Sequence, residues 1–119
     1  MSRLYALLAG LLAALAALHM ATTWRLTSAT AFTKVWFFGT GIAMAQAAAL
    51  NLLHRRYGAG ATGLRWVTRA SNAATLGIAS VAGWVTGASP GELALMLGLL
   101  AALLLLSFTR GSVAAGAPV

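Results

Sequence analysis

The chain has 119 residues, 61% of them hydrophobic, and it carries eight Lys or Arg against a single acid, Glu92. A water-soluble domain of this size cannot cover its surface with so few charged side chains. The cations are scattered between apolar blocks instead of lying on one polar face, which argues against nucleic acid as a partner. The absence of Cys excludes disulfides and thiolate sites. We therefore expect an integral membrane protein whose solvent is lipid.

Four long apolar blocks predict four membrane-spanning helices, at about residues 4–22, 35–54, 66–87 and 90–109. Ala and Leu favour helix, and the blocks lack the alternating pattern of a membrane barrel. The predicted fold class is therefore all-α, an integral membrane four-helix bundle. With short connections between the blocks, residues 1–119 leave room for this single domain only.

The first block holds no charged residue, whereas the second combines small and polar side chains. Small residues recur every four positions along the second block: Gly39, Ala43 and Ala47. Side chains at this spacing share one helix face and allow two backbones to approach closely in lipid. We expect this row to pack against another helix, either in the same chain or in a second copy.

The third block repeats that pattern, with small residues at Ala79, Gly83 and Gly87. The short loop before it makes the second and third helices antiparallel neighbours. Asn51 precedes the loop and Asn72 follows it at comparable distances, so the two amides should lie at similar depth and form a hydrogen bond.

Two further polar residues are expected near that amide pair. Gln46 lies about 7 Å deeper than Asn51 on the second helix, where it could reach Thr75 or a backbone carbonyl. The polar set Gln46, Asn51, Asn72 and Thr75 has two interpretations: it forms contacts between helices, or it lines a path for a solute or lipid.

The fourth block begins with a recognisable helix start. Ser89 is a candidate N-cap, Pro90 suits the first turn, and Glu92 falls where the helix dipole favours a negative charge. This is a structural use for the only acid in the chain.

The densest charge surrounds the loop between the second and third helices: His54, Arg55, Arg56, Arg65 and Arg69. One interpretation is anchoring of the membrane topology. The other is a site for an anionic lipid head group, because guanidinium groups match the geometry of phosphate oxygens.

The distribution of cations predicts the orientation. Six lie on the membrane side that holds both termini and the loop between the second and third helices: Arg3, Arg55, Arg56, Arg65, Arg69 and Arg110. The other side has Arg25 and Lys34. The positive-inside rule then places both termini in the cytoplasm, in a multi-pass protein of the inner membrane of a bacterium. The Trp and Tyr residues of the chain all fall near the predicted membrane interfaces, as expected for aromatic belts.

Function is less constrained than topology. One interfacial carboxylate and two distant His residues offer no catalytic set, metal cluster or cofactor site, so we expect no enzyme. Our first hypothesis is a self-associating or accessory subunit that binds lipids and either further copies of itself or a larger membrane protein. The alternative is an oligomeric channel or carrier for a neutral or anionic solute or lipid. A phage-type holin is a third possibility.

Overall fold

The computed structural model describes residues 1–113, which form four α-helices and a short 3-10 turn. The elements are α1 (Ser2–Thr23), α2 (Ala31–Tyr57), α3 (Thr62–Thr86), α4 (Pro90–Leu106) and η1 (Arg110–Ser112). This part of the chain contains no strand, so the all-α fold class is confirmed. Two of its helices, α1 and α2, are long and apolar enough to cross a membrane, and α4 is apolar but only 17 residues long.

Local capping signals set several helix ends. Thr30 caps α2, accepting a hydrogen bond from the Thr33 amide, so this helix starts at Ala31 and not near residue 35. The predicted start of α4 is confirmed as a capping box, in which Ser89 and Glu92 bond reciprocally and Pro90 occupies the first turn. The same helix ends at Leu106, three residues before the predicted boundary, and the chain then turns into η1.

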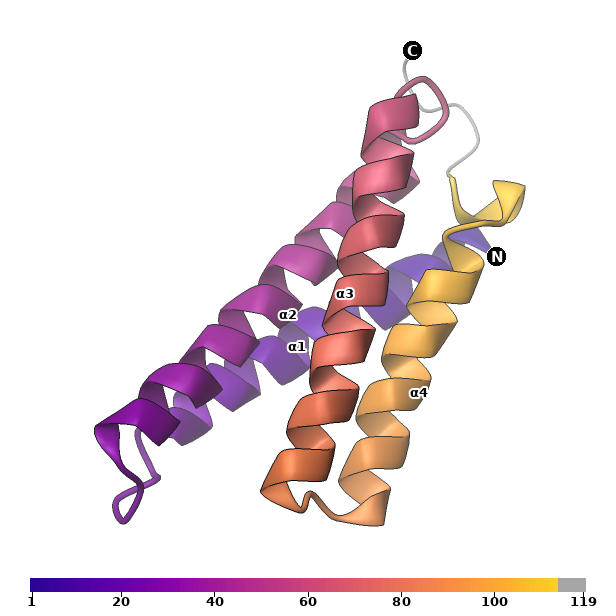
Figure 1. The fold of residues 1–119 in the computed structure, drawn as a ribbon. Coiled ribbons are helices and arrows are strands. Elements are labelled where there is room, and N and C mark those ends of the chain that lie inside the picture. Colours follow the sequence, from indigo (N-terminus) through magenta and orange to yellow (C-terminus); the bar gives the residue numbers. More distant parts are fainter. Residues whose placement is uncertain (114–119) are drawn as a thin grey trace.

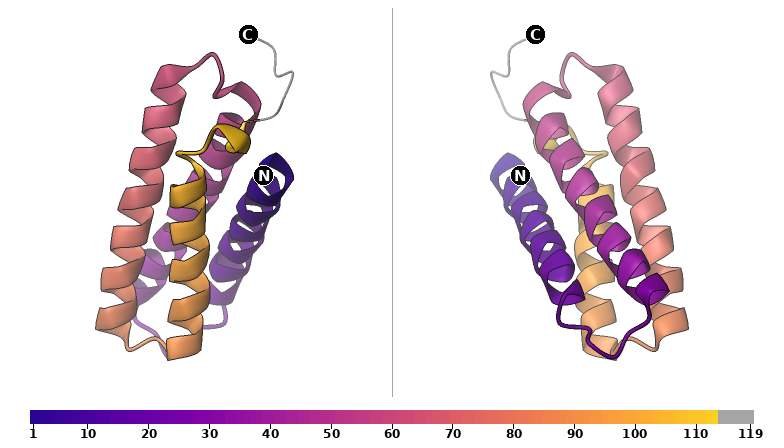
Figure 2. Two further views of the ribbon diagram at one scale, coloured as in Figure 1. Left: turned by 90° about the vertical axis from the view of Figure 1, so that its right-hand side faces the viewer. Right: turned by 90° about the vertical axis from the view of Figure 1, so that its left-hand side faces the viewer.

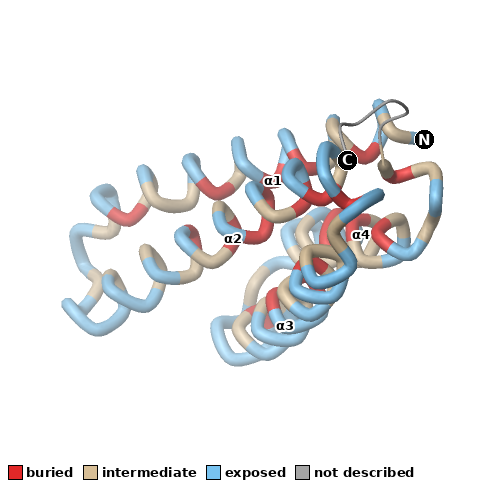
Figure 3. The backbone as a smooth tube through the Cα atoms, turned by 90° about the horizontal axis from the view of Figure 1, so that it is seen from above, coloured by how far each residue is buried: buried red, intermediate tan, exposed pale blue. Residues whose placement is uncertain are grey.

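The helices form two antiparallel hairpins, α1–α2 and α3–α4 (Figure 1). The hairpins meet at the end that holds the N-terminus and the α2–α3 turn, and they separate toward the end that holds the other two loops (Figures 1 and 2). Buried residues follow the inward faces of the helices, as the view from above shows (Figure 3).

The core combines small residues of the first hairpin with leucines of α4. Its fully buried members include Ala9, Leu12, Ala47, Leu100 and Leu103. α1 packs closely on α2 at Gly41, where a Cβ atom would lie 2.5 Å from Met20 Cγ and 3.3 Å from the Ala16 carbonyl oxygen. The spacing of small residues in the sequence did not single out Gly41.

The predicted small-residue rows are correct only in part. Ala47 is buried, Ala79 packs against the core, and Gly83 lies against Leu93 of α4. Gly39 packs against no helix within residues 1–113 and faces open space, because α1 packs on the Gly41 side of the helix; its packing against a second copy stays a prediction. Ala43 lies between these two environments and is half-buried.

Gly87 also departs from its predicted packing role. A Cβ atom there would have no neighbour within 4 Å, and the residue follows the last residue of α3 with φ of 65°. It therefore terminates the helix in the left-handed conformation that glycine adopts without strain.

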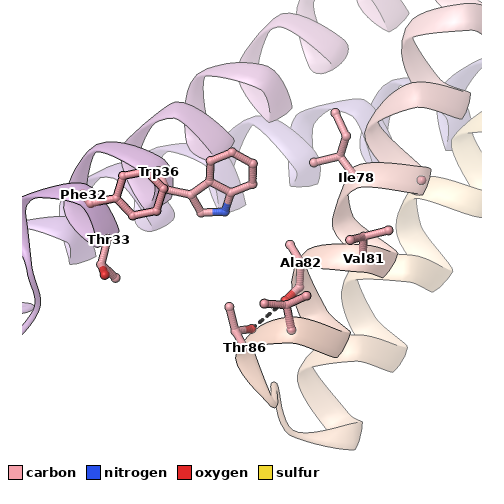
Figure 4. Close-up of a pocket in the computed structure, with 9 residues that line it drawn as sticks. Phe32, Thr33, Trp36, Ile78, Val81, Ala82 and Thr86 are labelled. Atoms are coloured by element: carbon pink, nitrogen blue, oxygen red, sulfur yellow. Dashed lines mark hydrogen bonds between the residues drawn. The ribbon is translucent and has the colours of Figure 1, made fainter.

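Where the hairpins separate, α2 and α3 border an apolar cleft of about 600 Å³ (Figure 4). Its walls are aromatic on α2, from Phe32 and Trp36, and aliphatic on α3, from Ile78, Val81 and Val85. Most of the buried polar side chains lie at the opposite end of the molecule, where the hairpins meet.

Candidate functional site

The predicted hydrogen bond between Asn51 and Asn72 is present, at the centre of a buried polar cluster. Asn51 Nδ2 donates to Asn72 Oδ1 at 2.7 Å, and Asn72 Nδ2 donates to Asn51 Oδ1 at 3.0 Å. Asn51 Nδ2 also donates to the Ala47 carbonyl oxygen at 2.7 Å, and the Tyr5 hydroxyl donates to Asn51 Oδ1. The cluster links α1, α2 and α3, and all three of its side chains are 0% exposed.

This network satisfies the polar atoms of Asn51 within the protein. Both hydrogens of its amide are donated and its oxygen accepts twice, which is the full capacity of that side chain. One turn before Asn72, the Thr68 hydroxyl donates to the Leu64 carbonyl oxygen of its own helix at 2.8 Å and lies 3.3 Å from the Leu50 carbonyl oxygen of α2. Thr75 is buried one turn beyond Asn72. The arrangement fits contacts between helices better than the lining of an open path.

Gln46 does not join this cluster. Its side chain is exposed, and it forms no hydrogen bond with the part of the chain that the structure describes. Its neighbours Met44, Ala47 and Ala48 occupy the buried face of α2, so Gln46 points outward. The expected reach to Thr75 or to a backbone carbonyl is therefore wrong. Small and apolar residues occur on every face of α2, so its sequence does not indicate which face is buried.

The predicted basic group divides into two parts. Arg55 turns toward the N-terminus, where its Nε donates to the Ser2 hydroxyl at 3.0 Å and to the Ser2 carbonyl oxygen at 3.1 Å. Arg56 is exposed, with its guanidinium 5.4 Å from the Tyr57 ring centre. Neither residue lines the cavity to which His54, Arg65 and Arg69 contribute.

That cavity, called here the basic pocket, has a volume of about 610 Å³ and lies between the α2–α3 turn and the chain after α4. The residues with which we define it are four basic and two aromatic: His54, Arg65, Arg69, Arg110, Trp66 and Phe108. From the sequence, Arg110 was expected to bear on topology alone, and Phe108 was not expected at a site. Their contribution depends on where α4 ends, which the local sequence does not encode.

Two guanidinium groups of the basic pocket are fixed by backbone oxygens. Arg69 donates from Nε and Nη2 to the Ser107 carbonyl oxygen, at 3.2 and 3.1 Å. Its Cζ atom lies 4.4 Å from the Phe108 ring centre and 5.4 Å from that of Trp66, within the range of cation–π attraction. Arg65 donates to the carbonyl oxygens of Gly58 and Ala59 at 2.9 and 3.2 Å, which ties it to the loop.

His54 lines a buried part of this site, with 1% of the residue exposed. Its Nε2 atom pairs with the Ser112 hydroxyl at 3.2 Å. Nδ1 is the only buried side-chain nitrogen or oxygen without a hydrogen-bond partner in residues 1–113. Native proteins leave few such atoms unpaired.

Other chemistry in the described residues is limited. Residues 1–113 contain no group of three or more His, Cys, Asp or Glu side chains that could hold a metal ion. The polar features of these residues are the fully buried amide cluster and the charged basic pocket. Comparison with known protein families, with curated proteins and with solved structures found no match to this chain.

Proposed function

We propose that this chain is a non-catalytic, multi-pass protein of the bacterial inner membrane that crosses the bilayer four times and acts by self-association. The observation that carries the membrane assignment is an apolar exterior around a core that also contains buried amides. The exterior exposes large apolar side chains, among them Trp24 at 79%, Phe32 at 78% and Trp84 at 87%. The interior instead buries the amides Asn51 and Asn72 completely. Water-soluble monomers rarely expose such extensive apolar surface.

The lengths and ends of the helices are compatible with four crossings. At 1.5 Å per residue, α4 spans about 26 Å and α3 about 37 Å, against a hydrocarbon core of about 30 Å. The α2–α3 turn shares its end of the molecule with the N-terminus (Figure 2), and six of the eight cations belong to the segments at that end. This asymmetry supports a cytoplasmic location for both termini.

Labelling of single cysteines tests the topology directly, because the natural chain has none. Ser28→Cys lies in the α1–α2 loop and Gly60→Cys in the α2–α3 turn, and both positions are exposed. In intact cells, an impermeant maleimide should label Ser28→Cys only after the outer membrane is opened, and Gly60→Cys only after lysis. Labelling of both from the same side would contradict four crossings.

The exposed face of α2 supports self-association. It presents Gly39, with open space around it, and Gln46, an amide directed toward the surroundings in the middle of an apolar helix. An amide in hydrocarbon gains about 0.6 to 2 kcal/mol from a hydrogen bond to another helix. Two copies related by a two-fold axis bring the same face together, so that each Gln46 can bond to the other.

The oligomeric state of purified variants tests this surface. Gln46→Leu and Gly39→Leu should shift the protein toward monomer in mild detergent, as measured by light scattering or native mass spectrometry. Gly10→Leu is the matched control on α1, since Gly10 is also exposed and a Cβ atom added there would have no neighbour within 4 Å. If the chain is monomeric and co-purifies with a larger protein, and Gln46→Leu abolishes that co-purification, an accessory role would replace self-association. Equal effects of all three variants would contradict a specific α2 face.

The transport alternative has less support. Its proposed lining residues Asn51 and Asn72 bond to each other, and Gln46 lies on the outside. A flux assay in proteoliposomes that detected transport, and its loss in Asn72→Leu with assembly intact, would favour that alternative.

A further inference from the structure

We propose that the basic pocket binds a phosphate ester of net negative charge, with the phosphate held between Arg69 and Arg110 beside the Trp66 ring. The sequence suggested anion binding by the whole basic group, including Arg55 and Arg56. The structure places the site on a different set of residues, those that line the basic pocket. This proposal depends on the fold of one chain and not on self-association.

No acidic side chain of residues 1–113 neutralises the charge of the basic pocket. Three arginines and His54 line one cavity of about 610 Å³. The only acidic side chain in the sequence is Glu92, in the first turn of α4, whereas the pocket lies beyond the other end of that helix. The separation from Glu92 to Ser107 corresponds to about 22 Å along the helix. Within the described residues these guanidinium groups therefore have no carboxylate as a counter-charge, and an anionic ligand would supply one.

The guanidinium of Arg69 is also preorganised for a ligand. The bonds to Ser107 hold Arg69 through Nε and Nη2, and the Phe108 and Trp66 rings flank its guanidinium. Its Nη1 group donates to no acceptor in residues 1–113 and keeps two hydrogens for a ligand. Arg110 is exposed and likewise forms no hydrogen bond within those residues. One fixed and one adjustable guanidinium can together chelate two phosphate oxygens.

The composition and size of the pocket indicate what the phosphate is attached to. A volume of about 610 Å³ holds a phosphate together with the glycerol unit of a lipid head group. Trp66 is 62% exposed and Phe108 is 57% exposed, so apolar surface adjoins the charged atoms. This combination suits an amphipathic phosphate ester better than a bare ion.

Calorimetric titration of the full-length protein in a nonionic detergent tests the proposal. The probes are dihexanoyl phosphatidylglycerol, glycerol 3-phosphate, inorganic phosphate and, as the zwitterionic control, dihexanoyl phosphatidylcholine. Arg110→Gln is the main variant, because this side chain supports no other described contact, and Arg56→Gln is its matched control with the same change in net charge. We expect Arg110→Gln to weaken binding of the anionic lipid about tenfold, and Arg56→Gln to change it less than about twofold.

The probes separate the possible sources of phosphate. Binding of phosphatidylglycerol alone identifies a lipid head group, and binding of glycerol 3-phosphate or inorganic phosphate as well identifies a site open to soluble esters. Both results support the proposal if Arg110→Gln weakens them selectively. Equal weakening by Arg56→Gln would show diffuse attraction and overturn it, as would phosphatidylglycerol binding no better than phosphatidylcholine. None of these outcomes depends on whether the Gln46 variants remain associated.

Discussion

Replacing Asn51 by Leu should destabilise the bundle by about 3 kcal/mol, because Asn51 takes part in four hydrogen bonds of the buried cluster. Three of these join different helices, and each such bond contributes about 0.6 to 1.7 kcal/mol in membrane proteins. Leu is close to Asn in shape, so the loss comes mainly from the bonds and from the groups left behind. The Asn72 amide and the Tyr5 hydroxyl, both 0% exposed, would remain without their partners.

A double-mutant cycle distinguishes this explanation from a simple packing effect. Asn72→Leu alone should cost about 2 kcal/mol, since Asn51 keeps its bonds to Tyr5 and to the Ala47 carbonyl oxygen. The double variant leaves no amide unpaired, so its cost should fall short of the sum of the single costs by about 1 to 2 kcal/mol. Reversible unfolding in mixed micelles of dodecyl sulfate and a mild detergent, followed by circular dichroism, provides the free energies. Ser80→Ala, which removes an exposed bond within α3, is the control and should cost less than about 0.5 kcal/mol. Additivity of the two Asn substitutions within about 0.3 kcal/mol would contradict a coupled amide pair.

Three further predictions concern glycines and a helix cap. Gly41→Leu should lower the unfolding free energy by at least about 2 kcal/mol, because its Cβ meets Met20 and the α1 backbone. Gly39→Leu should leave the stability of the monomer unchanged, since its Cβ meets open space. The same micelle titration compares the two variants, and equal costs would contradict the assigned faces of α2. Gly87→Ala should cost about 1 kcal/mol through its φ of 65°, with Gly77→Ala, which faces open space within α3, as the control expected to be neutral or stabilising. Ser89→Ala should cost about 1 kcal/mol and speed hydrogen exchange of the Glu92 amide, because the capping box is lost; unchanged exchange would argue against that bond in solution.

Local signals explain what could be predicted before the structure. Ser89, Pro90 and Glu92 specify a helix start within four residues, so no distant contact is needed to place it. The Asn51–Asn72 bond was predictable as well, because a short turn fixes the register of the two helices that it connects. Tyr5, the third member of the cluster, comes from another helix and gave no such signal.

The number of helices, their order and the concentration of charge at one end follow from the amino-acid sequence alone, since composition and short-range capping encode these properties. The buried side of α2, in contrast, depends on the packing of the whole chain, which places Gly41 inside and Gln46 outside. Ala and Gly occur on several faces of that helix, so hydrophobic periodicity does not distinguish one face from another. The basic pocket likewise arises from packing: Arg69 and Arg110 are far apart in the chain, and they share a cavity because α4 ends beside the α2–α3 turn.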